Sequence, residues 1–195
     1  GGRGWGLKRG VLVPNINQFL QNKKILILGF GREGRSTYAY LQKYVPSAKI
    51  DIADLNSDLK IKEQNLKLHL GDNYLDTLNG NYDLIIKSPG ITLKNINTTP
   101  FIKKLTSQAD LFLKFYRDQV IGITGTKGKS TVTSLLYHIL KSAGKDTLAI
   151  GNIGIPAFDV LDKIKKDTLI IYEFSSHQLE FIKTSPYIAV LLNIY

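Results

Sequence analysis

Short runs of apolar residues alternate along the first half of the chain with a segment of helical character. The apolar runs cover residues 24–28, 49–53, 66–70 and 84–87, and the helical segment covers residues 34–44. Short β-runs that alternate with helical segments are typical of a parallel sheet with helices packed on its faces. The pattern therefore predicts an α/β protein with a doubly wound, Rossmann-like sheet in this half.

The same alternation begins again near Gln119. Further strands are predicted at residues 120–124, 147–150, 169–174 and 188–194, the last as a buried strand. Residues 129–143 predict a helix, and Gly144 stands where a C-terminal glycine cap is expected. Apolar residues at helical spacing share one face of this helix: Val132, Leu135, Leu136, Ile139 and Leu140.

A domain boundary is expected at residues 115–119. The first predicted domain is Rossmann-like and covers residues 17–117, and the second covers residues 118–195. Residues 1–16 are rich in glycine and are expected to be a flexible arm or an artificial addition. The chain has no methionine and stops at Tyr195 at the end of an apolar run, so we expect a fragment of a longer protein.

Composition excludes several classes of protein. Hydrophobic residues make up 43% of the 195 residues, as in ordinary globular domains. No apolar run approaches the roughly 18 residues of a membrane span, and no secretory h-region is visible. Cysteine is absent, which rules out disulfides and thiolate metal sites. We therefore expect a cytoplasmic protein without membrane insertion.

The formal charge of +10 favours anionic partners such as nucleotides. A lysine-rich, solvated surface explains the same charge without any ligand. The lysines are scattered, and no basic segment interleaved with aromatic residues is visible, so we expect no nucleic-acid partner.

The strongest local motif is Thr-Gly-Thr-Lys-Gly-Lys-Ser-Thr at residues 124–131, between a predicted strand and a predicted helix. Glycines let backbone N–H groups approach phosphate oxygens, and the start of a helix favours negative charge. Lys129 can reach the β- and γ-phosphates, and the Ser130 hydroxyl can ligate Mg²⁺. The match to G-x-x-x-x-G-K-[ST] is incomplete because Ile123 stands in place of the first glycine. A glycine-rich turn without a ligand is the alternative.

This variant of the motif resembles the ATP loop of the Mur ligase superfamily. The resemblance implies that ATP phosphorylates a carboxylate and that an amine then displaces the phosphate. It implies ATP and Mg²⁺ as cofactors, and charge neutralisation of the transferred phosphoryl group by lysine and the metal ion. By this match the ATP-binding residues are Gly125, Thr126, Lys127, Gly128, Lys129, Ser130 and Thr131.

Two later motifs extend the resemblance. Gly-Asn-Ile-Gly at residues 151–154 is otherwise a loop before a helix starting at Pro156, but it resembles a segment of the D-glutamate-adding branch of the superfamily, which places Asn152 near nucleotide and substrate. Glu173 ends a predicted strand before Phe-Ser-Ser-His-Gln-Leu, which is otherwise a strand end with a serine cap. The match makes Lys129, Asn152 and Glu173 the catalytic residues.

By the same match Glu173 joins Ser130 as a Mg²⁺ ligand, while Ser175 and Gln178 face the muramoyl substrate. His177 departs from the aromatic residue usual in the family, and we interpret it as a wall residue rather than a catalyst.

The first half carries Gly-Phe-Gly-Arg-Glu-Gly at residues 29–34, after a strand and before a helix. Taken alone, this G-x-G-x-x-G motif suggests NAD or FAD, with Asp51 or Asp54 near the distance of a ribose-binding acid, or else a tight turn without a ligand. In the D-glutamate-adding branch, such a loop holds the diphosphate of a uridine-linked substrate. The match assigns substrate binding to Gly31, Arg32, Glu33, Gly34, Asp54, Leu55, Asn56, Ser88, Pro89 and Gly90.

The resemblance covers almost all of residues 17–195 and implies an ATP-dependent amide ligase that adds D-glutamate to UDP-N-acetylmuramoyl-L-alanine in peptidoglycan precursor synthesis. We expect a monomer that is inactive alone, because the family's metal-binding histidine, carbamylated lysine and third domain have no counterpart before Tyr195. Three alternatives stay open: another amide ligase of the superfamily, a non-catalytic nucleotide-binding module, and an NAD-dependent oxidoreductase.

Overall fold

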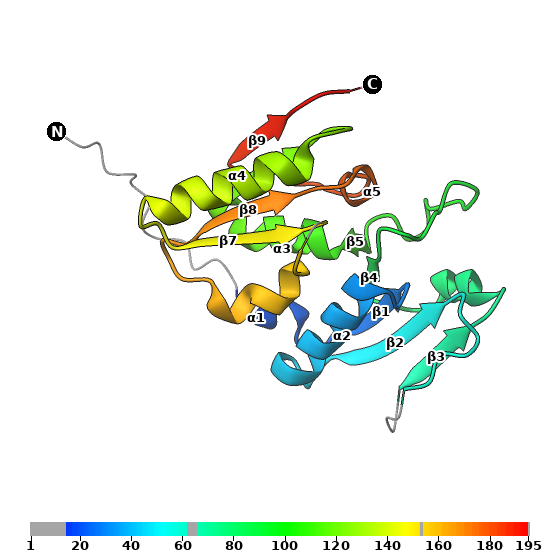
Figure 1. The fold of residues 1–195 in the computed structure, drawn as a ribbon. Helices are drawn as coiled ribbons and strands as arrows, with labels where there is room; N and C mark the ends of the chain where they lie inside the picture. The colour runs from blue at the N-terminus through cyan, green and yellow to red at the C-terminus, as the bar shows by residue number, and fades with distance from the viewer. Residues whose placement is uncertain (1–14, 62–65, 153, 195) are drawn as a thin grey trace.

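Two parallel β-sheets with helices packed against them form the protein (Figure 1). The computed structural model describes residues 15–61, 66–152 and 154–194. The arm predicted for residues 1–16 lies outside the described residues up to residue 14. Its last two residues are ordered, because Asn15 caps helix α1 (Ile16–Leu20) and Ile16 is buried.

The first sheet has the strand order β3-β2-β1-β4-β5, and all of its strands are parallel. Strand β1 (Lys24–Leu28) lies at its centre, between β2 (Lys49–Asp54) and β4 (Leu84–Lys87). The edges are β3 (Lys67–Leu70) and β5 (Leu105–Ser107). This order matches the first five strands of the doubly wound nucleotide-binding sheet, whose order is 3-2-1-4-5-6. The predicted α/β class is therefore confirmed.

Burial explains why the strands of this sheet read as continuous apolar runs. The last four residues of β1, Ile25 to Leu28, are each 0% exposed. A parallel sheet is covered on both faces, so its central strands lack the alternation seen in half-exposed sheets. Helix α2 (Arg32–Tyr44) begins two residues before its predicted start and buries Leu41 in the core.

The second sheet has the strand order β7-β8-β6-β9 and is also parallel. Its strands are β7 (Thr147–Gly151), β8 (Leu169–Glu173), β6 (Val120–Thr124) and β9 (Ile188–Leu191). Helix α4 (Lys129–Ser142) packs across β6, β7 and β8 and follows β6 directly after the second glycine loop (Figure 1).

Two burial predictions for this half are wrong. Strand β9 was predicted to be buried, but Ile188 is 44% exposed and Leu191 is 60% exposed. Within the described residues β9 pairs only with β6, so it is an edge strand, and an edge strand can have the same apolar sequence pattern as a central strand. The apolar face predicted for α4 also does not coincide with the face that is buried. Leu135 and Ile139 of the predicted face are more than half exposed, whereas Thr133, which lies outside the predicted face, is fully buried.

The sequence patterns did not predict α3 (Gln108–Tyr116) or the short 3-10 helices η1 (Tyr74–Asn79) and η2 (Arg117–Gln119). The 3-10 helix η3 (Ala157–Lys163) follows Pro156, where a helix start was one interpretation, and α5 (Ser176–Leu179) follows Ser175, where a serine cap was one interpretation. Among the helices of the described ranges, none combines the length and hydropathy needed to cross a membrane.

The two sheets share one hydrophobic core. Residues of β1 and of β8 belong to the same buried cluster. Helix α3 precedes the predicted domain boundary, yet the ring of Phe112 packs edge-on against Tyr172 of β8, with ring centroids 5.6 Å apart. Between α2 and η3, the Ser36 hydroxyl donates a 2.6 Å hydrogen bond to Asp159. The division between residues 117 and 118 stays a prediction.

Candidate functional site

The first glycine loop, residues 29–34, connects β1 to α2 at the C-terminal end of the first sheet. The turn is so tight that a Cβ atom on Gly34 would lie 2.1 Å from the Gly29 carbonyl oxygen, and only glycine fits there. The Phe30 N–H donates to Oδ2 of Asp54 at 2.5 Å. The carboxylate that ends β2 therefore holds the loop against the neighbouring strand.

The residues predicted to contact the uridine end flank this loop. Oδ1 of Asp54 accepts a 2.8 Å hydrogen bond from the Asn56 N–H, and Leu55 between them is 58% exposed. The turn after β4 lies on the other side of the loop, since the Ser88 hydroxyl donates to the Gly29 carbonyl at 2.7 Å. Pro89 and Gly90 follow Ser88 in the same turn. The fold brings both predicted groups to one edge of the sheet.

The second glycine loop, residues 125–128, connects β6 to the start of α4. The Lys129 ammonium folds back and donates to the carbonyl oxygens of Gly125 at 2.7 Å and Thr126 at 3.3 Å. No side chain caps the helix at Gly128, and Ser130 and Thr131 in its first turn are exposed. An uncapped helix N-terminus with a lysine and two hydroxyls is a chemically suitable anion site.

Asn152 and Glu173 meet beside this loop. The Asn152 side-chain amide donates to Oε1 of Glu173 at 3.0 Å, and the Asn152 N–H donates to the Glu173 carbonyl at 3.0 Å. Glu173 pairs with Ile123 of β6 and with Gly151 of β7, so it stands at the C-terminal edge of the second sheet. The Thr124 hydroxyl donates to the Phe174 carbonyl at 3.1 Å and ties the two strand ends together.

The chemistry of Glu173 fits a divalent cation. Its side chain is fully buried, and Oε2 has no hydrogen-bond partner among the described residues. A buried carboxylate oxygen without a partner is costly, and a bound cation or water would remove that cost. The described residues contain no cluster of three or more histidine, cysteine or acidic side chains, so Glu173 would act with hydroxyl, phosphate and water oxygens.

Ser175 and Gln178 form a reciprocal cap on the short helix α5. The Ser175 N–H donates to Oε1 of Gln178 at 2.8 Å, and the Gln178 N–H donates to the Ser175 hydroxyl at 3.3 Å. The remaining amide group of Gln178 donates to Oε1 of Glu33 in the first loop at 2.6 Å. Gln178 therefore links the two predicted substrate regions.

A second link from the first glycine loop to the second sheet runs through Arg32. Its guanidinium donates to the carbonyl oxygens of Asn152 at 3.0 Å and Gly151 at 3.4 Å. Arg32, predicted to bind a diphosphate, thus lies against Asn152, which was predicted to be catalytic and which hydrogen-bonds the predicted Mg²⁺ ligand Glu173. The sequence motifs predicted both groups, and the fold brings them together.

Two charged groups at this junction are shielded from water, Glu33 in part and Lys87 almost fully. Burial raises the pKa of Glu33 above its ordinary value of 4.5, although the Gln178 hydrogen bond and the charges of Arg32 and Lys87 partly oppose the shift. Lys87 is 2% exposed and forms a 3.3 Å ion pair with Glu180 from the segment after β8. Sequence reasoning missed Lys87, because a lysine at the end of an apolar run carries no signal of burial.

Gln108 is another residue that the sequence did not reveal. Its side-chain nitrogen donates to the Ser36 and Thr37 hydroxyls at 3.2 and 3.1 Å, and its oxygen accepts from the Ala157 N–H at 3.0 Å. It therefore joins α2 to η3. Gln108 starts a helix that the apolar pattern did not predict, so no sequence feature pointed to it.

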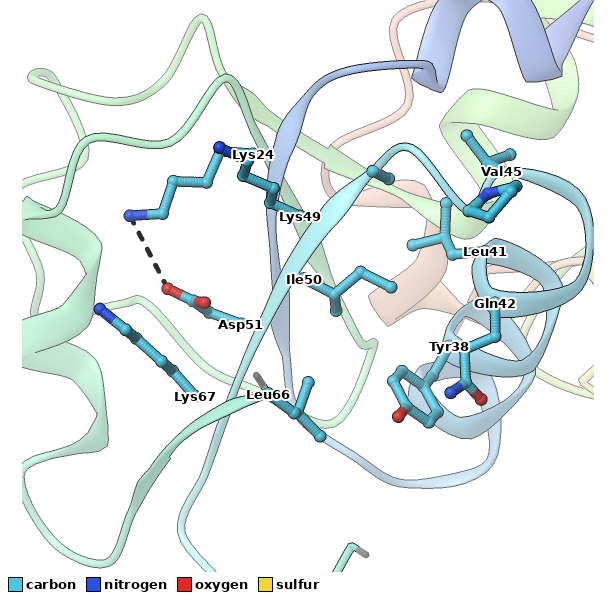
Figure 2. Close-up of a pocket in the computed structure, with 12 residues that line it drawn as sticks. Lys24, Tyr38, Leu41, Gln42, Val45, Lys49, Ile50, Asp51, Leu66 and Lys67 are labelled. Carbon is cyan, nitrogen blue, oxygen red and sulfur yellow. Dashed lines mark ion pairs between the residues drawn. The ribbon is translucent and has the colours of Figure 1, made fainter. Parts of the chain in front are cut away.

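A cavity of about 560 Å³ lies elsewhere. Lys24, Lys49 and Lys67, which line it, begin three parallel strands, so it opens at the edge opposite the glycine loops. In Figure 2 Lys24, Lys67 and Asp51 lie on one side of β2, while Tyr38 lies on the other. Open α/β sheets bind ligands at the C-terminal ends of their strands. We therefore assign the candidate site to the glycine loops.

Comparison with known proteins identifies the family of the chain. A sequence profile of the Mur ligase middle domain matches residues 123–195. The chain is 36% identical over 192 residues to UDP-N-acetylmuramoylalanine–D-glutamate ligase of Clostridium botulinum strain Hall, with 92% of the chain covered. The protein belongs to the Mur ligase family. The Clostridium kluyveri ligase of the same name is 33% identical over 193 residues, again with 92% of this Mur ligase chain covered.

The Mur ligase chain spans 41% of the length of these curated relatives. Among solved structures, the UDP-N-acetylmuramate:L-alanyl-gamma-D-glutamyl-meso-diaminopimelate ligase from Neisseria meningitides matches with a TM-score of 0.46 and 16% identity, covering 89% of this chain and 61% of that one. The roles of the individual site residues in this Mur ligase stay predictions.

Proposed function

We propose that this chain is part of an ATP-dependent ligase that joins D-glutamate to UDP-N-acetylmuramoyl-L-alanine. One observation carries the proposal: Arg32 of the first glycine loop donates to the carbonyls of Gly151 and Asn152, beside the second loop. A ligase must bring a nucleotide-linked carboxylate to the γ-phosphate of ATP, and two adjacent glycine loops suit that task. The names of the curated relatives support the choice of substrates.

In this proposal the first sheet binds the uridine diphosphate of the substrate. The diphosphate lies on the loop at residues 31–34, where Arg32 supplies positive charge. Asp54, Leu55 and Asn56 contact the uridine, together with the turn at residues 88–90. Ser175 and Gln178 face the muramoyl group, and the Gln178–Glu33 hydrogen bond supports their position next to the first loop.

The second sheet activates the alanine carboxylate. Residues 125–131 bind the triphosphate, and Lys129 exchanges its carbonyl acceptors for phosphate oxygens. A carboxylate oxygen of alanine attacks the γ-phosphorus, ADP leaves, and an acyl phosphate forms. The amine of D-glutamate then attacks the acyl carbon and loses a proton, and inorganic phosphate leaves as the amide forms. Asn152 orients Glu173, as their 3.0 Å hydrogen bond suggests.

Ser130 and Glu173 would hold Mg²⁺ between them and the phosphates. The ion supplies positive charge that neutralises the transferred phosphoryl group. The unpartnered Oε2 of Glu173 supports this assignment. Consumption of ATP locates the proposed reaction in the cytoplasm, and we propose that the protein acts there as a monomer.

Because the chain spans 41% of the relatives' length, we propose that it binds UDP-N-acetylmuramoyl-L-alanine and ATP but does not catalyse the reaction alone. Calorimetry of the 195-residue chain tests binding, with UDP-N-acetylmuramoyl-L-alanine and with a non-hydrolysable ATP analogue plus Mg²⁺. We expect both to bind. A phosphate-release assay with ATP, UDP-N-acetylmuramoyl-L-alanine and D-glutamate tests inactivity, and D-glutamate-dependent release would refute it.

Further titrations, with a folate and with NAD, separate the alternatives. Binding of a folate in place of the UDP-linked substrate would indicate another amide ligase of the superfamily. Tight binding of NAD to the first loop, without binding of the UDP-linked substrate, would indicate an oxidoreductase and overturn the proposal. Failure to bind the ATP analogue would overturn it as well.

A further inference from the structure

Asn193, two residues after the end of β9, contacts the second glycine loop through both its backbone and its side chain. Its carbonyl oxygen accepts from the Thr126 N–H at 3.0 Å. Its side-chain oxygen accepts from the Lys127 N–H at 2.9 Å, and its side-chain nitrogen donates to the Lys127 carbonyl at 3.1 Å. Both backbone polar groups of Lys127 are therefore held by one side chain.

The amide of Asn193 continues the strand pairing where strand geometry ends. The last ladder contact between β6 and β9 pairs Thr124 with Leu191, and the Leu192 N–H still donates to the Thr124 carbonyl at 3.0 Å. Beyond that point the loop turns away from the strand. A primary amide has the donor and the acceptor of a peptide group, so it can pair with a backbone residue as a neighbouring strand would. Aspartate lacks the donor.

Close packing shows that the start of the loop is fitted to this contact. Gly125 has a φ of +146°, and a Cβ atom there would lie 3.1 Å from Cβ of Leu192 and 3.2 Å from both N and O of Asn193. A side chain at residue 125 would therefore need both an unusual backbone conformation and a shift of the 192–193 segment. Glycine lets the loop lie directly against Asn193.

The same contact fixes the resting position of the loop lysine. Lys129 donates to the carbonyl oxygens of Gly125 and Thr126. Asn193 binds the N–H of Thr126 and both backbone polar groups of the next residue, Lys127. Movement of residues 126–127 would shift the acceptors of Lys129 and the backbone that leads into α4. A group that fixes this backbone therefore also fixes where a phosphate can lie.

We propose that Asn193 is a positioning residue of the phosphate loop, which holds residues 126–127 in the conformation that accepts the polyphosphate of a nucleotide. The inference rests on the proposed function, because it takes the loop to be an ATP site. It adds a residue that no glycine-loop motif contains and that lies more than sixty positions away in the sequence.

Two variants test the role against a matched control. Asn193→Ala removes both side-chain hydrogen bonds, and Asn193→Asp keeps the acceptor but replaces the donor with a charged oxygen. Asn97→Ala removes an asparagine that likewise accepts a local backbone hydrogen bond, from Thr99, far from the loop in sequence. Sodium tripolyphosphate is the probe, because it tests the loop without any adenine contact.

By calorimetry we expect Asn193→Ala to bind tripolyphosphate about tenfold more weakly than the parent chain. Asn193→Asp should lose at least as much, because its carboxylate also repels the phosphates. Asn97→Ala should bind normally. UDP binding at the first loop should stay unchanged in all three, and amide hydrogen exchange at Lys127 should rise in Asn193→Ala alone.

The outcomes separate the two proposals. If the parent chain binds tripolyphosphate and Asn193→Ala binds it equally well, the role of Asn193 is wrong and the ATP site stands. If affinity falls only in step with the unfolding temperature, and UDP affinity falls too, Asn193 has a merely structural role and the inference is overturned. If the parent chain binds neither tripolyphosphate nor the ATP analogue, both proposals fall.

Discussion

The side-chain amide of Gln178 donates a 2.6 Å hydrogen bond to Oε1 of Glu33, and this contact spans the two sheets. Glu33 lies in the first turn of α2, and Gln178 belongs to α5 after the second sheet's strand β8. The other oxygen of Glu33 is buried without a partner among the described residues. The junction therefore contains a carboxyl group whose ionised form is poorly solvated.

Burial at this junction predicts a pH dependence of stability. The folded protein raises the pKa of Glu33 above 4.5, so below pH 4.5 both folded and unfolded chains hold the proton. Above that pH the unfolded chain releases the proton first, which favours unfolding, so the contribution of Glu33 is lost as the pH rises through the folded pKa.

Glu33→Gln keeps an acceptor for Gln178 and removes the titration. Urea unfolding of both proteins between about pH 4 and pH 8 should show the parent losing stability relative to the variant as the pH rises. Parallel stability curves would contradict the prediction.

Removal of the loop lysine should abolish most nucleotide affinity. We expect Lys129→Ala to weaken binding of the ATP analogue by about 10- to 100-fold, the value of one strong charge-assisted hydrogen bond. The unfolding temperature should change little, since Lys129 donates only to carbonyl oxygens of its own loop. The exposed Lys141, in the last turn of α4 at the end away from the loop, is the control, and Lys141→Ala should cost less than about threefold. Equal losses in the two variants would indicate a general charge effect.

Neutralisation of the buried carboxylate should uncouple nucleotide binding from the metal ion. In the parent chain, Mg²⁺ should tighten binding of the ATP analogue, and chelation with EDTA should reverse the effect. In Glu173→Gln that difference should disappear, while Oε1 still accepts from Asn152. Stability should be unchanged or higher, because an unpartnered buried oxygen is replaced by a neutral amide. Asp118→Asn, at an exposed surface ion pair, is the control and should keep the Mg²⁺ effect.

Two glycine-to-alanine substitutions in the first glycine loop add the same methyl group but differ in the space available to it. Gly34→Ala puts a methyl group 2.1 Å from the Gly29 carbonyl oxygen and should destabilise the fold by about 3 kcal/mol. Gly31→Ala meets nothing within 4 Å and should be nearly neutral for stability. Thermal unfolding of the two variants checks the difference. Similar midpoints would show that the β1–α2 turn relaxes around the added methyl group.

Much of this fold could be predicted because parallel strands buried on both faces consist of continuous apolar runs, as in β1 and β8. The sequence predicted both glycine loops because the backbone requires glycine in each: no side chain fits at Gly34 in the first loop, and Gly125 and Gly128 in the second have positive φ angles. Strand β5 was missed, since three residues carry too little periodicity to be noticed, and the nine-residue helix α3 was missed as well.

Contacts between distant polar residues could not be predicted in the same way. None of the site's sequence motifs includes Gln108, Lys87 or Asn193. Their roles come from contacts with residues far away in the sequence. Periodicity also misjudged β9, because an apolar strand has the same pattern whether or not a second strand lies on its outer side.

The Arg32 contact has a consequence for how such proteins change over evolution. Its acceptors are the main-chain oxygens of Gly151 and Asn152, which every amino acid supplies. Replacement of Asn152 therefore leaves its acceptor in place. Gly151 has a φ of +107°, and a Cβ atom there would lie 2.3 Å from the Glu173 carbonyl oxygen, so this position is held as glycine for a reason unrelated to Arg32. In an alignment of relatives the contact would leave no pair of correlated positions, so methods that infer proximity from covariation would overlook the bridge between the first glycine loop and residues 151–152.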